Sequence, residues 1–335
     1  MSAGEEFRRL QRLAPYLAAS GPGVPVGVGD DAAVVTVGGA DVVVCVDVLV
    51  EGVHFRRDWS EPADVGWKAL AVNVSDIAAM GAVPRAAVVG LTRPPQLSED
   101  DVEALYRGMA EAARTWDVAI VGGDTTTGDR WTISVTVIGD PAGAPVVRRD
   151  GAGVRDVVVL AGRIGAAACA VRAATAGHPA DPRHMAAHRR PQAMPCSGRA
   201  LAQAGATAMI DLSDGLGGDA RHLCEASGVS IRLNAAAVRN ALADGVADAL
   251  HEEPDGVDDA ALDVVLGGGE DFALLATLPA DRLAEASAAV AAAGEGTLTP
   301  IGVVTAAPPD GQPAVWLDED GEAPRRIDHL GYDHG

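Results

Sequence analysis

The stretch EPADVGWKALAVNVSDIAAMG, residues 61–81, decides how the first part of this chain folds. Pro62 and Asp64 are typical of a helix start, because proline fits the first turn and acidic groups favour the positive end of the helix dipole. Gly81 is typical of a helix end. The stretch therefore predicts one helix that ends near Met80.

This predicted helix carries an acidic residue where apolar residues are expected. Its inner stripe consists of Val65, Ala69, Val72, Asp76 and Ala79. A helical aspartate normally faces water, because a buried carboxylate without a partner is unfavourable. We therefore expect Asp76 to meet a cation or a hydrogen-bond donor inside the protein.

The segments around the helix predict an α+β first domain, with a mixed sheet and helices on one face. Strand patterns cover residues 24–28, 32–37, 41–50, 86–91, 118–121 and 131–139, and helical patterns cover 5–19 and 98–115. The segment Asp140-Pro-Ala-Gly-Ala-Pro145 breaks these patterns. We place a domain boundary there, which predicts one domain at 1–140, for metal and ATP binding and for dimerisation, and a second at 146–335.

The second half predicts an α/β layered domain. Its strand patterns cover residues 156–161, 207–210, 229–233, 271–278 and 299–304. Its helical patterns cover 164–176, 197–205, 215–227, 234–244 and 280–293. The acidic segment 251–259 is expected to be an exposed loop.

Composition narrows the classes of function. The chain has 335 residues and a formal net charge of −21, which argues against nucleic acid and anionic membranes as partners. The four cysteines form no C-x-x-C pair and fit no zinc pattern. The sequence shows neither a signal-peptide pattern nor an apolar run long enough to span a bilayer, so a cytoplasmic location is expected.

Further acidic residues stand where glycine-rich turns meet apolar strands or helices. They are Asp30, Asp31, Asp47, Asp124, Asp211, Asp214, Glu270 and Asp271. The chain has a single lysine, Lys68, so ammonium groups cannot neutralise this set. Divalent cations with oxygen ligands are the natural alternative, and Mg²⁺ commonly arrives with substrate phosphates. Because the chain has neither a Walker A motif nor a protein-kinase glycine loop paired with His-Arg-Asp, an ATP site would need another architecture.

Seven segments, in order along nearly the whole chain, resemble the thiamine-monophosphate kinase family. They are GVGDDAAV (27–34), VDVLVEGVHF (46–55), KALAVNVSDIAAMG (68–81), GGDTT (122–126), IDLSDG (210–215), GGED (268–271) and GYDH (331–334). The resemblance implies the fold shared with aminoimidazole ribonucleotide synthetase, in which N-terminal domains pair across a homodimer. It also implies ATP-dependent phosphorylation of thiamine monophosphate to thiamine diphosphate.

The resemblance also implies roles at matching positions. The metal ligands for several Mg²⁺ ions would be Asp30, Asp47, Asp76, Asp124, Asp211 and Asp214, and three of these, Asp30, Asp124 and Asp211, would act in catalysis through the ions. ATP would contact Gly123, Asp124, Arg149 and Ser213. Thiamine phosphate would contact His54 and Glu270.

Two departures from the family pattern affect these roles. Relatives commonly have Ser-Thr-Asp-Thr where this chain has Cys45-Val46-Asp47-Val48, which removes hydroxyls near the metal and leaves the number of bound ions open. Relatives often have an aromatic residue before the GYDH motif, and here His329 is the candidate to replace it as a substrate contact.

Other interpretations stay open. Taken singly, Asp30 fits a turn, Ser213 or Asp214 fits a helix cap, and His54 fits a structural histidine. The rival functions are another ATP-dependent enzyme of the same fold and a divalent-cation-binding module without turnover. Phosphoryl transfer between two anions requires their repulsion to be cancelled, which metal ions and Arg149 would do, so the kinase is our leading hypothesis.

Overall fold

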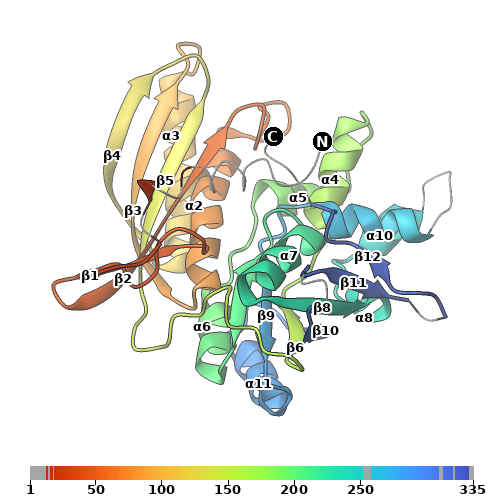
Figure 1. Ribbon diagram of the computed structural model, residues 1–335. Helices are drawn as coiled ribbons and strands as arrows, with labels where there is room; N and C mark the ends of the chain where they lie inside the picture. Colours follow the sequence, from red (N-terminus) through yellow and green to blue (C-terminus); the bar gives the residue numbers. More distant parts are fainter. Residues whose placement is uncertain are drawn as a thin grey trace.

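The computed structural model describes residues 13, 16, 17, 19–251, 258–308, 312–319 and 321–331. It contains two β-sheets, each packed against helices (Figure 1). Most of the predicted helix at 5–19, the middle of the acidic segment 251–259 and most of the GYDH motif lie outside the described residues. Among the described helices, none combines the length and the apolar composition that crossing a bilayer requires.

The first sheet has five strands in the order β1-β2-β5-β3-β4. Its strands are β1 (Ala33–Val37), β2 (Ala40–Val50), β3 (Val83–Arg93), β4 (Ala119–Thr127) and β5 (Thr132–Asp140). β3 and β4 run parallel, and the other neighbours run antiparallel. The sheet is therefore mixed, as predicted.

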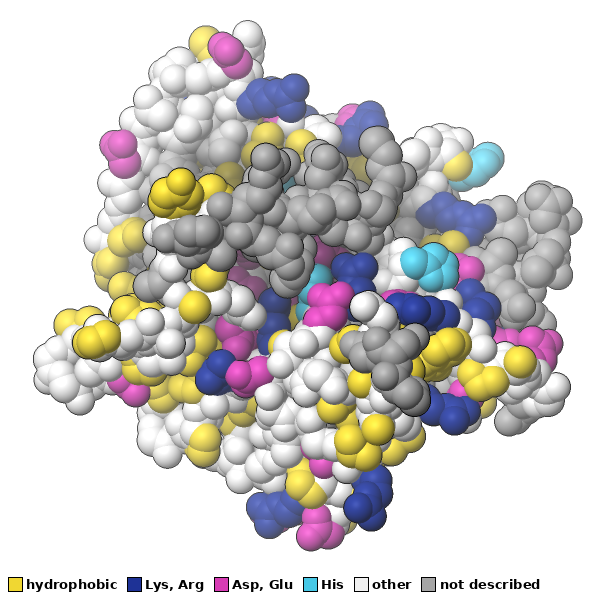
Figure 2. Space-filling model, viewed as in Figure 1, with side chains coloured by type: hydrophobic (Ala, Val, Ile, Leu, Met, Phe, Trp, Pro, Cys, Tyr) yellow, Lys and Arg dark blue, Asp and Glu magenta, His cyan; other side chains and the backbone are white. Residues whose placement is uncertain are grey.

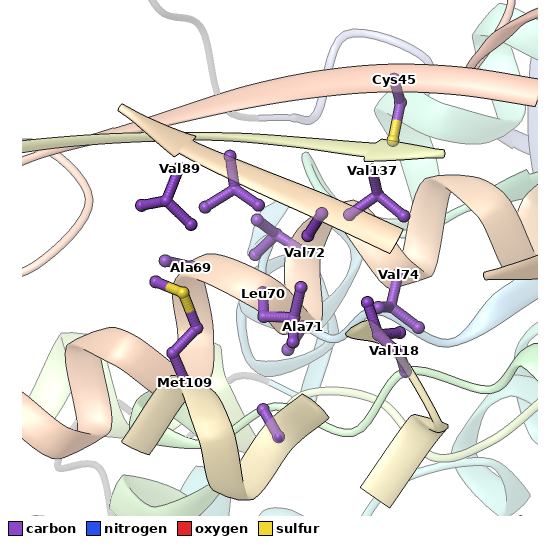
Figure 3. Packing of buried hydrophobic residues seen from close by; sticks show 14 of the residues in the cluster. Cys45, Ala69, Leu70, Ala71, Val72, Val74, Val89, Met109, Val118 and Val137 are labelled. Atoms are coloured by element: carbon purple, nitrogen blue, oxygen red, sulfur yellow. The ribbon is translucent and has the colours of Figure 1, made fainter. Parts of the chain in front are cut away.

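Two helices, α2 (Pro62–Ala79) and α3 (Glu99–Trp116), cover one face of this sheet (Figure 1). α3 begins with a capping box between Ser98 and Asp101. Side chains such as Leu70 from α2 and Met109 from α3 form one apolar core with the sheet (Figure 3). On the opposite face Val46 is 58 % exposed, and the part of the chain that the structure describes does not cover it.

The second sheet has seven strands in the order β12-β11-β8-β10-β6-β9-β7. They are β6 (Val157–Ala161), β7 (Ala208–Asp211), β8 (Val229–Asn234), β9 (Leu274–Leu278), β10 (Leu298–Ala306), β11 (Val315–Asp318) and β12 (Arg325–Arg326). Successive side chains of β6 pack into two different apolar cores. Val158 and Leu160 belong to one core, and Val159 and Ala161 belong to the other. Because successive side chains of a strand point to opposite faces, both faces of this sheet are covered, which confirms the layered second domain.

The helices of the second domain are α4 (Ala166–Thr175), α5 (Pro182–Arg189), α6 (Pro195–Ala204), α7 (Leu216–Ser227), α8 (Ala235–Asn240), α9 (Val246–His251), α10 (Asp258–Gly267) and α11 (Leu283–Ala293), which follows the short 3₁₀ helix η2 (Ala280–Arg282). The sequence did not predict α5, α9, α10, β11 or β12. α5 has a polar sequence, PRHMAAHR, without a long apolar period, so pattern alone does not reveal it. β4 also continues through Gly122-Gly123-Asp124, where the sequence predicted a strand end.

α2 joins the two domains. Its Ala78 and Ala79 belong to the same buried cluster as Leu201 of α6 and Met209 of β7. At Gly198 of α6 a Cβ atom would overlap the carbonyl group of Ala78, so the two helices touch through backbone. The C-terminal end of α2 is therefore held rigidly at the seam between the domains, and Asp76 lies in this last turn of the helix.

Candidate active site between the two domains

Three carboxylates meet at this seam. One oxygen atom each of Asp31, Asp76 and Asp211 lies within 4.8 Å of the other two. Asp31 lies in the loop before β1, Asp76 in the last turn of α2, and Asp211 at the end of β7. Both domains thus contribute to one acidic cluster, which we define as these three residues.

The negative charges of the acidic cluster are only partly neutralised by the groups around them. Asp211 is 3 % exposed, and its Oδ2 atom has no hydrogen-bond partner among the described residues. Burial, together with the charge of Asp31, raises the pKa of Asp211 to about 8. Burial and the charges of Asp47 and Asp211 also raise the pKa of Asp76 well above its usual value. Like charges in a desolvated site disfavour ionisation, and a bound cation reverses this.

Arg149 is the basic residue that directly contacts the acidic cluster. Its Nη2 and Nε atoms donate to the two oxygens of Asp31 at 2.6 and 3.2 Å. Its backbone N–H donates to Oδ2 of Asp30 at 3.3 Å. Burial and the neighbouring Asp31 still raise the pKa of Asp30 to about 6. One guanidinium therefore offsets only part of the negative charge gathered here.

Asp47 is held beside the cluster by Asn73 of α2. The Asp47 N–H donates to Oδ1 of Asn73 at 2.9 Å, and the Cys45 thiol donates to the Asn73 carbonyl at 3.3 Å. Asn73 in turn donates from Nδ2 to the carbonyl of Ala69 at 3.0 Å. Cys45 thus fastens β2 to α2 and so helps to place Asp47.

The donor set of the acidic cluster fits a hard divalent cation. All of its potential ligand atoms are carboxylate oxygens, the type that Mg²⁺ and Ca²⁺ prefer. The buried Oδ2 of Asp211 supports this, because the Ser75 hydroxyl only partly offsets the raised pKa of Asp211 and a bound cation would supply the missing contact. These residues therefore suit the Mg²⁺ that the sequence predicted.

A second group of possible ligands follows along the same loop and helix. Asp214, Asp219 and His222 each offer an atom within 4.8 Å of the other two. Asp219 accepts hydrogen bonds from the N–H groups of Asp214 and Gly215, both at 3.1 Å. Asp219 thus shapes the turn that presents Asp214 at the start of α7.

The loop that carries Glu270 packs on this turn. The Glu270 N–H donates to the Ser213 carbonyl at 2.8 Å, and a Cβ atom at Gly269 would overlap that carbonyl. Glu270 has φ +68°, an unfavourable value for a residue with a side chain. The run of glycines before Glu270 therefore permits a close backbone approach that directs its side chain to the domain seam.

The Glu270 carboxylate contacts two side chains, one from each domain. Lys68 of α2 donates from Nζ to Oε1 of Glu270 at 2.5 Å, and Nδ1 of His188 lies 2.6 Å from Oε2. Lys68 also donates to the carbonyl of His54 at 3.1 Å. Although burial opposes ionisation, Lys68 and His188 lower the pKa of Glu270 to about 2. We call Lys68, Glu270 and His188 the ion-paired group.

The His54 ring is half-buried, and its Nδ1 accepts the N–H of Val50 at 3.1 Å. In the neutral ring the proton is therefore on Nε2, which can donate to a ligand.

Asp124 lies apart from the acidic cluster. The register across the sheet pairs Asp47 with Val135, Val135 with Val89, and Val89 with Gly123. Three strand spacings, about 14 Å, therefore separate Asp47 from Gly123. Paired residues share a face, so Asp124, one residue further, lies on the face that α2 and α3 leave uncovered.

The remaining predicted site residues are at the surface or at its edge. Ser213 is exposed beside Asp214. His329 is exposed in the loop after β12, and its role as a substrate contact stays a prediction. Figure 2 shows acidic, basic and histidine side chains gathered in a recess near the middle of one face of the molecule.

The site roles assigned from the sequence did not include Asp31, Lys68, His188 or Asp219. Asp31 belonged to the set of acidic residues at glycine-rich turns, but its pairing with Arg149 becomes evident only in three dimensions. Lys68 had a usable signal, because it is the single lysine of the chain and lies about two turns before Asp76 on the same predicted helix. His188 had none, since α5 itself was not predicted.

Comparison with known proteins agrees with this architecture. Residues 29–140 match AIR synthase related protein, N-terminal domain, and residues 154–311 match the corresponding C-terminal domain. The thiamine-monophosphate kinase of Mycobacterium tuberculosis is 44 % identical over 256 residues, which cover 76 % of this chain and 74 % of that protein. The Bacillus subtilis thiamine-monophosphate kinase is 38 % identical over 63 % of this chain and 67 % of its own length.

A solved structure, described as AaThiL complexed with AMPPCP and TMP, superposes on 98 % of this chain and 97 % of its own chain, with a TM-score of 0.79 and 28 % identity. Both domains, their order and the fold are thus shared with these proteins. The chain belongs to the AIR synthase related proteins and, within them, to the thiamine-monophosphate kinase family.

Proposed function

We propose that the chain transfers the γ-phosphoryl group of ATP to thiamine monophosphate, which yields thiamine diphosphate and ADP. The observation that carries the proposal is the acidic cluster, assembled from both domains beside Arg149, in a chain that is 44 % identical to a thiamine-monophosphate kinase. The AMPPCP and TMP in the AaThiL complex support both an ATP site and a thiamine-phosphate site in this chain.

In this proposal Asp31, Asp76 and Asp211 hold Mg²⁺, with Asp30 and Asp47 beside them. When bound, Mg²⁺ neutralises phosphate charge and draws the two phosphate groups together. Arg149 adds a fixed positive charge that can bind a phosphate oxygen. Ser213 and Asp214 lie at the start of α7, a helix end that favours anions.

The acceptor needs orientation more than activation. A phosphate monoester oxygen is already ionised near neutral pH, so the attack on the γ-phosphorus needs no strong general base. His54 and Glu270 would hold the organic part of the acceptor, while the cluster aligns its phosphate. A new oxygen–phosphorus bond forms, and the bond between the β,γ-bridging oxygen and the γ-phosphorus breaks.

A homodimer would bring Asp124 and Gly123 into use. Asp124, next to Gly123 in β4, lies on the uncovered sheet face, where Val46, Val48 and Val121 are 58, 44 and 64 % exposed. An apolar face of this kind favours burial against another protein surface. We propose that a second copy covers it. Val48→Arg is expected to give monomers in analytical ultracentrifugation; an unchanged sedimentation coefficient would contradict this.

The test of the proposed function is a coupled assay with purified protein, ATP, Mg²⁺ and thiamine monophosphate, with thiamine diphosphate measured by chromatography. Stoichiometric ADP and thiamine diphosphate, abolished by EDTA, are expected. ADP release only with an acceptor of another enzyme of this fold would favour the rival enzyme. Stabilisation by Ca²⁺ alone, without turnover or any nucleotide effect, would favour a cation-binding module. A cytoplasmic location remains a prediction.

A further inference from the structure

The ion-paired group uses the chain's single lysine. Lys68 is 2 % exposed, so its ammonium group is kept out of water and requires strong partners. It has two, the Glu270 carboxylate and the carbonyl of His54. These two residues, one from each domain, are the predicted contacts for the organic part of the acceptor. One buried cation thus fixes both sides of that subsite.

His188 holds the other oxygen of Glu270 and is itself rigidly placed. The His188 side chain is 4 % exposed, and the ring of Trp59 contacts its edge, with ring centroids 6.3 Å apart. Two residues after it, Arg190 forms ion pairs with Asp64 at 2.6 Å and Glu111 at 2.9 Å, which tie the end of α5 to α2 and α3. The helix that carries His188 is therefore fixed against the first domain by ion pairs.

Glu270 nevertheless remains open on one side. Its side chain is 27 % exposed, although each oxygen already has a partner. A carboxylate has about four acceptor positions, so a ligand can still donate to it. Because Lys68 and His188 take one position on each oxygen, they fix the direction in which the remaining positions point.

We infer that Lys68 and His188 are positioning residues, which hold the Glu270 carboxylate as a preformed acceptor for a nitrogen donor on the acceptor substrate. This inference rests on the proposed function. The aminopyrimidine amino group of thiamine monophosphate is a donor of the required kind. Preformed acceptors bind more tightly, because the side chain loses no further freedom on binding.

The experiment compares Lys68→Met, Glu270→Gln and the double variant Lys68→Met/Glu270→Gln, with Arg85→Met as the matched control. Arg85 forms an exposed ion pair with Asp140 in the same domain, at 3.1 Å. KM for thiamine monophosphate and for ATP is measured, together with the Kd for thiamine monophosphate by calorimetry. The double variant removes both charges, so it avoids an unpaired buried carboxylate.

Lys68→Met is expected to raise KM and Kd for thiamine monophosphate by about tenfold to hundredfold, with KM for ATP within about twofold. Because Lys68 acts through Glu270, the double variant should match Glu270→Gln. His188→Leu should follow Lys68→Met, and His188→Asn, whose amide can reach Glu270, should recover part of the affinity. Arg85→Met should behave as the parent protein.

Three results would overturn the inference alone: an unchanged Kd in Lys68→Met, an equal rise in KM for ATP, or single-variant effects that multiply in the double variant. An unaltered protein that binds no thiamine monophosphate would overturn the proposed function, and the inference with it.

Discussion

The acidic cluster and the ion-paired group lie at the same domain seam, yet their charges are balanced in opposite ways. In the cluster, burial and mutual repulsion raise the pKa of Asp211 to about 8. In the ion-paired group, Lys68 and His188 overcome burial and lower the pKa of Glu270 to about 2. The contrast indicates that the cluster is completed by a cation from solution, whereas Glu270 is prepared before any ligand arrives.

The sharpest test of this contrast is Asp211→Asn. The variant keeps the shape of the side chain and removes one charge from the cluster, so we expect kcat to fall by about 10²–10³-fold. The metal-free variant should unfold at the same or a higher temperature than the parent protein, because like-charge repulsion is relieved. Steady-state kinetics and thermal unfolding measure the two effects.

Asp156→Asn is the matched control for this variant. Asp156 is also buried, but it accepts hydrogen bonds from Gly153 at 2.9 Å and from the Thr207 hydroxyl at 2.6 Å. We expect it to lose stability and to keep its turnover. If Asp211→Asn lost stability and kept activity in the same way, the acidic cluster would be structural.

The opposite result is expected at the ion-paired group. Lys68→Met leaves a largely buried carboxylate without its ammonium partner, so the free energy of unfolding should fall by about 3 kcal/mol. This is the lower end of the range for breaking a buried ion pair, because Glu270 is partly exposed. Urea unfolding of the metal-free protein measures this. A variant as stable as the parent would show that water already compensates Glu270.

Most of the fold was predictable from local sequence, and the site was predictable only in part. The 61–81 stretch predicted α2 because capping residues and apolar period agree along it. α5 was missed because its short polar sequence forms a helix against the rest of the protein, which no local pattern reports.

The site differs because its members come from distant segments. Asp76 could be found from its place on an apolar helix face. The partners Asp31 and His188 are recognisable only once tertiary packing brings them to Arg149 and Glu270. Asp124 was predicted with the cluster, but the sheet register places it on the other face, and its role depends on the proposed second copy.

The pH dependence of Mg²⁺ binding should separate the two groups further. The raised pKa values mean that the folded metal-free protein binds more protons than the unfolded chain between about pH 4 and 8, so this cluster lowers stability as pH rises through that window. Mg²⁺ must displace these protons, so its apparent affinity should rise by up to about tenfold per pH unit below pH 8 for each proton displaced.

Calorimetric titration of Mg²⁺ at several pH values checks this dependence. Asp211→Asn is the control, and its pH dependence should be weaker. The pKa of Glu270 is depressed, so its carboxylate is ionised throughout the range above about pH 5. The contribution of the ion-paired group to stability should therefore not change with pH in that range. A Mg²⁺ affinity independent of pH would mean that the three carboxylates are already ionised without metal.

The smallest expected effect comes from an ordinary surface ion pair, which sets the scale for both groups. Arg232 and Asp318 pair at 2.8 Å, but their side chains are 45 and 34 % exposed, so water and salt screen the interaction. Arg232→Met should change the free energy of unfolding by no more than about 0.5 kcal/mol, and KM for either substrate should not change. Urea unfolding and kinetics in parallel with Lys68→Met make the comparison direct, since both variants remove one cation from one carboxylate. If the two lost equal stability, burial at the seam would not distinguish Glu270 from a surface carboxylate, and the idea of a prepared acceptor would lose its physical basis.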